Sequence, residues 1–250
     1  INGSRCFSIL SSVFKKMIKK TSFAAAVDDP RRVLNGGCLC AKGSEIMITA
    51  TDGFVLSSAK HRLSENVEND MRVVLSNRTL SEIMRLLRDE AIINVYLSSN
   101  QIMLMFNDIV FISRLIDGSF PDYESFIPNI TRNNVLHVKN SVLLNACKRV
   151  DIMVSEGINV FDFGIIDNVI QITSFTPGLG EAKENVTDID YKGENFNVVY
   201  NSKHMINVLR NIDAEEIDML FISKSMAGVI NIKDENEEYF YFIMSIEDKK

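Results

Sequence analysis

Three aspartates beside predicted turns, Asp52, Asp117 and Asp122, are the residues best placed to bind a metal ion. Carboxylate oxygens are the ligands that Mg²⁺ prefers, and a bound Mg²⁺ could support phosphoryl transfer. However, glycine follows Asp52 and Asp117, and proline precedes Asp122, a composition typical of ordinary turns. We therefore favour turn residues, and keep a Mg²⁺-dependent phosphoryl-transfer enzyme as an alternative function.

The cysteines and histidines give weaker signals. The spacing of Cys6, Cys38, Cys40 and Cys147 resembles no zinc ligand set, so we interpret them as small buried residues of a reducing compartment. The three histidines, His61, His137 and His204, are far apart in the sequence and have no recognisable catalytic partner. The sequence also lacks the G-x-S-x-G, H-E-x-x-H, Walker and dinucleotide-binding motifs. We expect no catalytic residue, no metal and no cofactor.

Two stretches of the chain predict the same amphipathic helix with a basic outer face. In residues 12–20, apolar side chains recur at helical spacing and lysines occupy the other face. Residues 141–149 repeat this plan 129 positions later and also end in a basic pair. A strand that runs into a second helix occurs at 73–88, with Asn77 or Thr79 as the predicted cap, and again at 198–210. The near-equal offsets indicate two duplicated domains, each with its own core.

Strand patterns fill the rest of each repeat, and turn residues such as Asn-Gly and Asp-Gly separate them. The order helix, strands, helix, strands predicts an α+β fold with two helices packed on one face of an antiparallel sheet in each domain. The predicted strands are 45–50, 54–58, 92–97, 101–106 and 109–115 in the first repeat, and 159–164, 168–173, 217–223, 228–232 and 239–246 in the second.

Length and composition agree with two folded domains. The chain has 250 residues, 46% of them hydrophobic and 24% charged, with a formal net charge of −6. Residues 1–130 hold 15 Lys and Arg against 14 Asp and Glu, whereas residues 131–250 hold 12 against 19. We place the two domains at 1–130 and 131–250, because the stretch 128–134 has no periodicity. No apolar run is long enough for a membrane helix and no signal peptide is recognisable, so we expect a soluble, cytoplasmic protein.

One string of residues carries a family resemblance. Residues 113–123, Ser-Arg-Leu-Ile-Asp-Gly-Ser-Phe-Pro-Asp-Tyr, followed by Ile-Pro at 127–128, resemble a signature of the bacterial DNA polymerase III β subunit family, the sliding clamps. Residues 32–36, 50–53, 196–200 and the last strand, 239–244, continue the likeness. The resemblance covers nearly the whole chain, but only the second and third of the family's three domains.

The resemblance implies two tandem clamp-type domains in a crescent, belonging to a processivity factor. In the family, two chains close into a ring around duplex DNA, hold it without sequence specificity and tether the replicative polymerase, of which they are a non-enzymatic accessory subunit. Basic residues of the helices, and of one loop, would then face DNA. They are Lys15, Lys16, Lys19, Lys20, Arg31, Arg32, Arg85, Arg88, Lys148, Arg149, Lys203 and Arg210.

The resemblance also implies a groove between the two domains that binds short peptide motifs. Its partners would be the polymerase III α subunit, the clamp loader and repair proteins. By position the groove residues are Leu34, Thr51, Gly53, Phe54, Val55, Leu56, Pro121, Ser125, Phe126, Phe242 and Met244. This chain departs from the family at Phe54 and Val55, often His-Arg, at Ser125, often Arg, and at 245–248, where the family usually ends Pro-Met-Arg-Leu.

Ring closure is the third implied property. The matching interface residues are Ile152, Met153, Glu181 and Glu184. Because no first domain is recognisable and the sequence begins at Ile1, we expect a fragment that cannot close the homodimeric ring and is a monomer. A peptide-binding adaptor that does not contact DNA is the remaining alternative.

Overall fold

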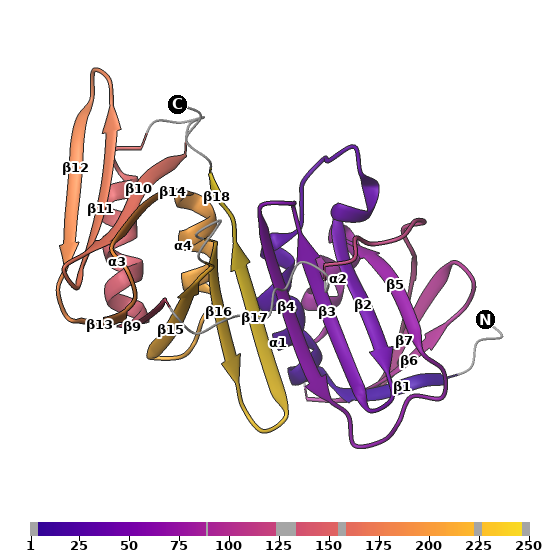
Figure 1. Cartoon of the computed structure of the whole chain (residues 1–250). Helices are drawn as coiled ribbons and strands as arrows, with labels where there is room; N and C mark the ends of the chain where they lie inside the picture. The colour runs from indigo at the N-terminus through magenta and orange to yellow at the C-terminus, as the bar shows by residue number, and fades with distance from the viewer. Residues whose placement is uncertain (1–4, 89, 124–133, 155–158, 223–226, 247–250) are drawn as a thin grey trace. The chain divides into compact units, whose positions relative to one another are not determined.

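A computed structural model of the chain describes residues 5–88, 90–123, 134–154, 159–222 and 227–246. They belong to two units (Figure 1): Ile1–Tyr123 with Lys233–Phe240, and Glu124–Ile232 with Tyr241–Lys250. The sequence predicts the boundary at 130, whereas the units divide seven residues earlier, after Tyr123.

In the first unit, alternation of apolar and polar residues builds two antiparallel sheets. Strand β3, for example, buries Ile46, Ile48 and Ala50 on one face and turns Met47 to the other. One sheet has the order β1-β6-β7-β8, with bounds Arg5–Leu10, Ile92–Leu97, Gln101–Phe106 and Ile109–Arg114. The other contains β4-β3-β2-β5, with bounds Val55–Arg62, Glu45–Thr51, Gly36–Lys42 and Met71–Ser76.

The second unit repeats this plan. One sheet has the order β12-β11-β10-β14-β18, with bounds Gly180–Val186, Val169–Thr176, Val160–Ile166, Phe196–Asn201 and Ser245–Ile246. The other contains β13-β9-β15-β16, with bounds Ile189–Lys192, Val135–Lys139, Glu216–Phe221 and Gly228–Lys233. Strand β17, Glu237–Ile243, begins in the first unit and ends in the second.

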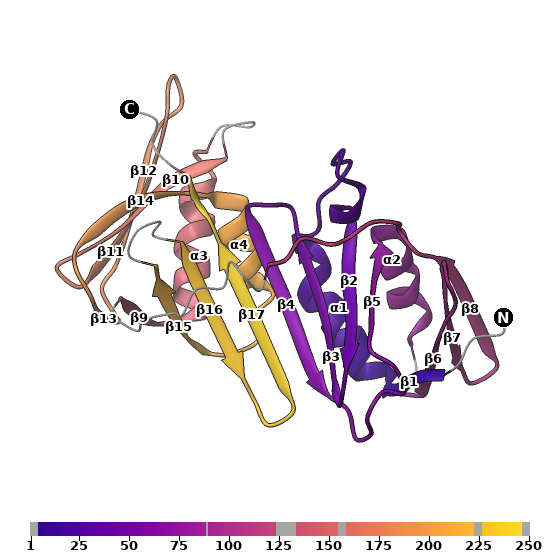
Figure 2. The ribbon, with the colours of Figure 1, turned by 45° about the vertical axis from the view of Figure 1, so that its right-hand side comes forward.

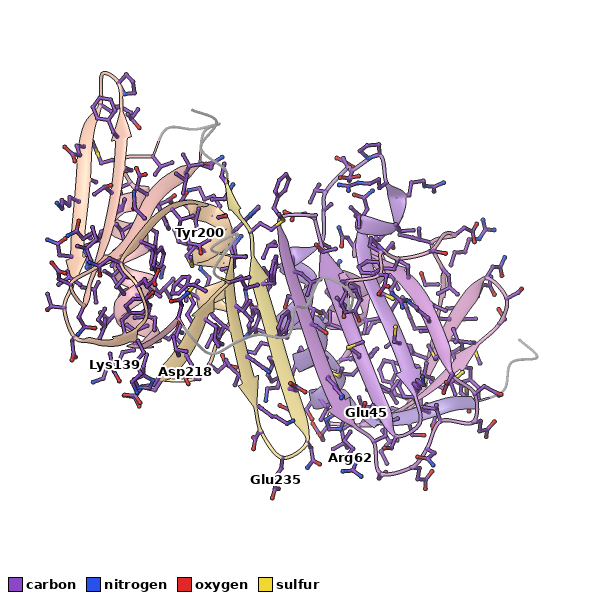
Figure 3. The ribbon with its side chains drawn as sticks, viewed as in Figure 1. Glu45, Arg62, Lys139, Tyr200, Asp218 and Glu235 are labelled. Atoms are coloured by element: carbon purple, nitrogen blue, oxygen red, sulfur yellow. The ribbon has the colours of Figure 1, made fainter. Side chains whose placement is uncertain are left out.

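Aromatic rings fill the core of the second unit. Phe163 packs against Tyr200, Phe196 and Phe221 with ring centroids 5.8 to 6.4 Å apart. Tyr200, labelled in Figure 3, is completely buried, and this burial raises the pKa of its hydroxyl group. Such large side chains contribute most of the apolar area that stabilises a core of this size.

Among the described residues of each unit, two α-helices pack against the strands (Figure 2). Helix α1, Ser11–Thr21, buries Phe14, Met17 and Ile18, and contacts β3 and β4, while α2, Asn77–Leu86, contacts β2 and β5. In the second unit α3, Asn140–Asp151, packs on β11 and β12, and α4, Ser202–Arg210, on β10 and β14. Two short 3₁₀ helices, Ser22–Ala24 and Arg32–Leu34, complete the helical segments described. Among the described residues, no helix is long and apolar enough to cross a membrane.

The predicted α+β class is confirmed, as are the four helices, within two residues at each end. The helix cap predicted for α2 is wrong. Neither Asn77 nor Thr79 caps it, because β5 runs into the helix without a loop and leaves Ser76 extended at the junction, where its Oγ accepts from the Thr79 N–H at 3.1 Å. The sequence also does not identify β1, β2, β9, β12, β13 and β18 as separate strands. Of these, β1 and β9 run directly into α1 and α3.

Candidate functional site

The four helices present basic side chains to solvent, and these form the first candidate site. Lys19 on α1 and Lys148 on α3 occupy the same position in the two repeats, each directly after a fully buried residue, Ile18 or Cys147. Helical periodicity therefore directs both lysines outward. The exposed cations on or just after the α-helices are Lys16, Lys19, Arg78, Arg85, Arg88, Lys148, Arg149, Lys203 and Arg210; all but Arg78 were predicted to face DNA.

Several of these cations are held by a carboxylate. Arg149 donates two hydrogen bonds to Glu184 at 2.7 and 2.9 Å, and its guanidinium lowers the pKa of that carboxyl group. Ion pairs also join Lys16 to Glu237 at 2.5 Å, Lys203 to Asp151 at 2.6 Å, Arg31 to Asp29 at 2.9 Å and Arg85 to Glu82 at 3.4 Å. A paired cation attracts a phosphate group less strongly, because the neighbouring anion offsets its field.

Four predicted DNA-facing residues make no ion pair with any residue that the structure describes. They are Lys19, Arg32, Lys148 and Arg210, all exposed. Arg88 is also exposed, and its Nε donates to the Arg85 carbonyl at 3.3 Å. These five cations keep their charge available at the surface.

Two lysines of α1 differ from the others. Lys20 is only 3% exposed, and its Nζ lies 6.0 Å from the centroid of the Tyr239 ring. Lys15 is half-buried, and its Nζ donates to the Leu87 carbonyl at 2.8 Å, just after the end of α2. Both side chains therefore stabilise the first unit, a role that their presence in a basic run does not indicate.

The turn that bears Phe54 is the second candidate site. Asp52 Oδ1 accepts from the backbone N–H groups of Phe54 and Val55 at 2.8 and 2.9 Å, and Thr51 Oγ1 donates to the Val55 carbonyl at 2.7 Å. Gly53 has φ of +98°, which glycine adopts without strain. The turn leaves Phe54 60% exposed.

The other predicted groove residues lie in different environments. In the first unit, Leu34, Thr51, Val55 and Leu56 are buried, while Gly53 and Pro121 are exposed. In the second unit, Phe242 is half-buried and Met244 is 43% exposed. Ser125 and Phe126 lie outside the described residues.

The predicted ring-interface residues lie near one end of α3 and on β12. Ile152 is 78% exposed, Met153 is half-buried, and the Met153 carbonyl accepts from Thr176 Oγ1 at 2.6 Å. Glu181 is exposed, whereas Glu184 binds Arg149. The sequence interpretation missed two apolar side chains on the hairpin of β11 and β12. These are Phe175 and Leu179, which are 72% and 66% exposed. The sequence pattern that could have identified them is an apolar residue on each side of the Pro-Gly turn.

The three aspartates of the alternative enzyme do not form a metal site. Asp52 binds the backbone of its own turn, as described above. Among the residues that the structure describes, no three His, Cys, Asp or Glu side chains are grouped so that they could hold a metal ion. The alternative metal site at Asp52, Asp117 and Asp122 is therefore contradicted.

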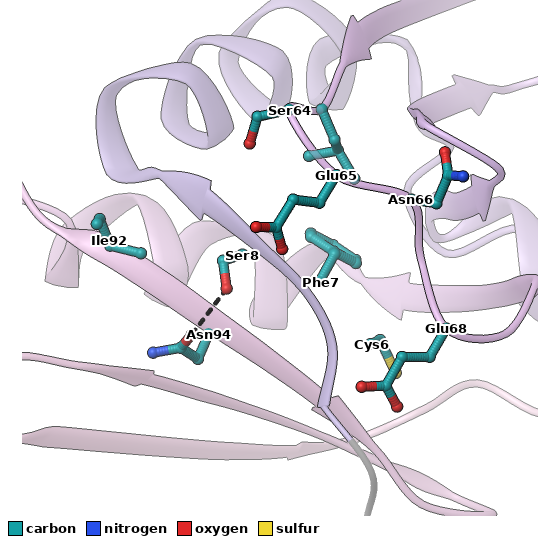
Figure 4. A pocket seen from close by; sticks show the side chains of 10 residues that line it. Cys6, Phe7, Ser8, Ser64, Glu65, Asn66, Glu68, Ile92 and Asn94 are labelled. Carbon is teal, nitrogen blue, oxygen red and sulfur yellow. Dashed lines mark hydrogen bonds between the residues drawn. The ribbon is translucent and has the colours of Figure 1, made fainter.

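A pocket of about 470 Å³ in the first unit lies beside β1, β6 and residues 63–68 (Figure 4). Glu65 and Glu68 line it, and Ser8 Oγ donates to Asn94 Oδ1 at 2.8 Å. Burial, together with the charge of Glu68, raises the pKa of the Cys6 thiol. Negative charge on the lining opposes a phosphate ligand, so this pocket does not belong with the basic surface.

Comparison with known proteins gives matches for both units. Residues 8–122 match the family described as "DNA polymerase III beta subunit, central domain", and residues 124–247 match "DNA polymerase III beta subunit, C-terminal domain". A "Beta sliding clamp" of Rickettsia bellii is 29% identical, with 96% of this chain and 66% of the relative covered. A second "Beta sliding clamp", of Staphylococcus epidermidis, is 30% identical, with 90% of this chain and 59% of the relative covered.

Solved structures give the same result. A DNA polymerase sliding clamp from Pseudomonas aeruginosa matches with a TM-score of 0.92 and 26% identity, over 99% of this chain and 67% of that chain. A DNA polymerase III beta subunit from Thermotoga maritima matches with a TM-score of 0.90 and 30% identity, with the same coverage. The chain spans 59 to 66% of the length of these curated relatives.

Proposed function

Because the chain belongs to the DNA polymerase III beta subunit family, we propose that it is part of a sliding clamp. Such a clamp encloses duplex DNA and tethers the replicative polymerase to it, and catalyses no reaction itself. The observation that carries this proposal is the repetition of exposed cations on corresponding helices, Lys19 on α1 and Lys148 on α3, with Arg210 on α4. None of the three makes an ion pair with a residue that the structure describes.

This surface suits a backbone-binding role. Lysine and arginine interact with phosphates of any sequence, and the attraction falls steeply with salt concentration. Cations concentrated on the helices also explain how a chain of net charge −6 can bind DNA. The electrostatic field close to the duplex, and not the net charge of the chain, acts on the phosphates.

We propose that the second function is the capture of short peptide motifs of polymerases and clamp loaders. Phe54 and Met244, both exposed, would contact the apolar anchors of such a peptide. Leu34, Val55 and Leu56 are buried and would support the groove from beneath. Because Phe54 and Val55 replace the usual His-Arg, the preferred motif of this chain would be more apolar than is typical.

The third element of the proposal is ring closure through the second unit. Strand β12 ends the sheet order β12-β11-β10-β14-β18, so its outer edge has no described strand beside it. Such an edge pairs readily with a strand of another molecule. Ile152, next to α3, would add apolar contact with the neighbouring subunit in the complete ring.

DNA binding can be tested on the chain itself. We expect weak binding to fluorescein-labelled duplexes at low salt, with equal affinity for two unrelated sequences. In the Lys19→Ala, Lys148→Ala, Arg210→Ala triple variant, the slope of log K against log salt should become shallower by ~0.9 for each phosphate that the variant no longer neutralises. Fluorescence anisotropy over a salt titration measures both quantities.

A matched control removes three exposed lysines that lie outside the helices, Lys42, Lys192 and Lys233. This variant should keep the wild-type slope. Equal slopes for the helix variant and the wild type would contradict the proposed surface. Absence of any binding at low salt would instead favour a peptide-binding adaptor.

A further inference from the structure

Cys38 and Cys40 place their sulfur atoms together on one face of a sheet in the first unit. They are two residues apart on β2, so their side chains point to the same side, and the two Sγ atoms are 3.6 Å apart. Strand β2 lies between β3 and β5, which holds this spacing in place. Cys38 is fully buried and Cys40 is half-buried.

Strand register adds a third sulfur atom. Met47 on β3 lies opposite Cys40, and residues that face each other across antiparallel strands share one side of the sheet. The Tyr123 hydroxyl lies 3.5 Å from Met47 Sδ, and Thr49 Oγ1 donates to that hydroxyl at 3.0 Å. Tyr123, which is 4% exposed, thus packs beside the Met47 sulfur atom and limits its contact with water.

We propose that Cys38, Cys40 and Met47 form a binding site for one soft monovalent metal ion, Cu(I) or Ag(I). Thiolate and thioether sulfur are the ligands that such ions prefer over oxygen. Metal–thiolate bonds of ~2.3 Å place two sulfur atoms ~3.8 to 4.0 Å apart in tetrahedral or trigonal sites. The pair therefore needs to open by only a few tenths of an ångström.

The number of ligands favours a monovalent ion over Zn²⁺. A structural zinc site takes four ligands, usually Cys or His. Around Cys38 and Cys40, the described residues supply no third Cys, His, Asp or Glu to such a site. Two thiolates and one thioether are enough for Cu(I) or Ag(I), which accept low coordination numbers.

A positively charged residue near the site can balance the negative charge that metal binding creates. Two thiols and one M⁺ ion form a bis-thiolate complex of charge −1 and release two protons. Arg72 lies opposite Cys40 on β5, and its guanidinium carbon is 5.9 Å from the centroid of the Tyr123 ring. The guanidinium balances this negative charge, as groups that surround the ligands do in other metal sites.

Competition with a colorimetric Cu(I) chelator under anaerobic conditions tests the site on the full reduced chain. We expect the wild type to hold one Cu(I) per chain, and Ag(I) to displace it. The Cys40→Ser variant should lose this ion, and Met47→Leu should bind it ~10- to 100-fold more weakly. Cys6→Ser, which removes a half-buried cysteine elsewhere, is the matched control and should bind as the wild type does.

Circular dichroism of each variant shows whether the fold is kept, and Cys38→Ala provides a second test if Cys40→Ser is unstable. The proposal is overturned if the wild type takes no Cu(I) from the chelator, or if Cys40→Ser and Cys38→Ala bind as tightly as the wild type. Unchanged affinity in Met47→Leu would overturn the three-sulfur site.

Discussion

At the scale of single residues, His137 on β9 lies close to the carboxylate groups of neighbouring residues. Its Nδ1 lies 2.8 Å from Asp218 Oδ1 and its Nε2 3.4 Å from Glu216 Oε2, with Asp190 opposite it on β13 (Asp218 is labelled in Figure 3). The hydrogen bond to Asp218 raises the pKa of His137 above its ordinary value of 6.5. A raised pKa adds stability that is complete below pH 6.5 and disappears as pH rises through the folded pKa.

We therefore expect His137→Gln to lower the urea midpoint slightly below pH 6.5 and to leave it unchanged at high pH. The effect is small because the side chain is 49% exposed and solvent screens its charge. Urea unfolding at a series of pH values, with His204→Gln as control, measures it. A destabilisation independent of pH would contradict a role for the charged imidazole.

At the scale of elements, the junctions between strands and helices differ between the four helices. Ser76 caps α2 and Asn201 caps α4 through side-chain oxygens, whereas Leu10 and Lys139, which precede α1 and α3, provide no side-chain cap. Ser76 also shares a 2.8 Å hydrogen bond with the Thr79 hydroxyl. The second helix of each unit therefore depends on one residue for its start.

We expect Ser76→Ala to lower the free energy of unfolding by ~1 kcal/mol, because it leaves an N–H group at the start of α2 without its acceptor. Ser81→Ala removes an exposed hydroxyl from the middle of the same helix and should change stability by less than ~0.5 kcal/mol. Urea titration followed by circular dichroism compares them. Equal effects of the two substitutions would show that the cap is not important.

At the scale of the whole molecule, Phe54 and Met244, both exposed, are the residues proposed to contact a bound peptide. We expect Phe54→Ala and Met244→Ala each to weaken binding of a fluorescent clamp-binding peptide by ~2 kcal/mol, about 30-fold, as is typical of interface anchors. Ile109→Ala removes an apolar side chain of 37% exposure from β8 and serves as the control. Unchanged peptide affinity in either variant would contradict the role proposed for that residue.

Much of the fold was predictable because its signals are local. Apolar spacing located the four helices, and alternation located most strands, including β6, β7 and β8. Strands β1, β2, β9, β12, β13 and β18 were missed. The cap of α2 was misplaced by one to three residues, because no turn marks where β5 ends and the helix begins.

The candidate site was less predictable, because residues far away in the sequence decide whether a charged side chain is paired, buried or exposed. Lys16 and Lys19 look alike in the sequence, yet Lys16 pairs with Glu237, 221 positions away, and Lys19 makes no ion pair with a described residue. Lys20 belongs to the same basic run and is buried. Spacing along one helix predicts a face but not the partners that cover it.

By itself, then, the sequence determined the duplication, the α+β class and the family resemblance, since these depend on order and spacing along one chain. Only the tertiary structure decided which cations are held by carboxylates, that Asp52 binds its own turn, and that Met47 lies opposite Cys40. These facts depend on strand register and on contacts between distant segments. Such contacts form only when the chain folds, because packing and pairing, and not local propensity, select them.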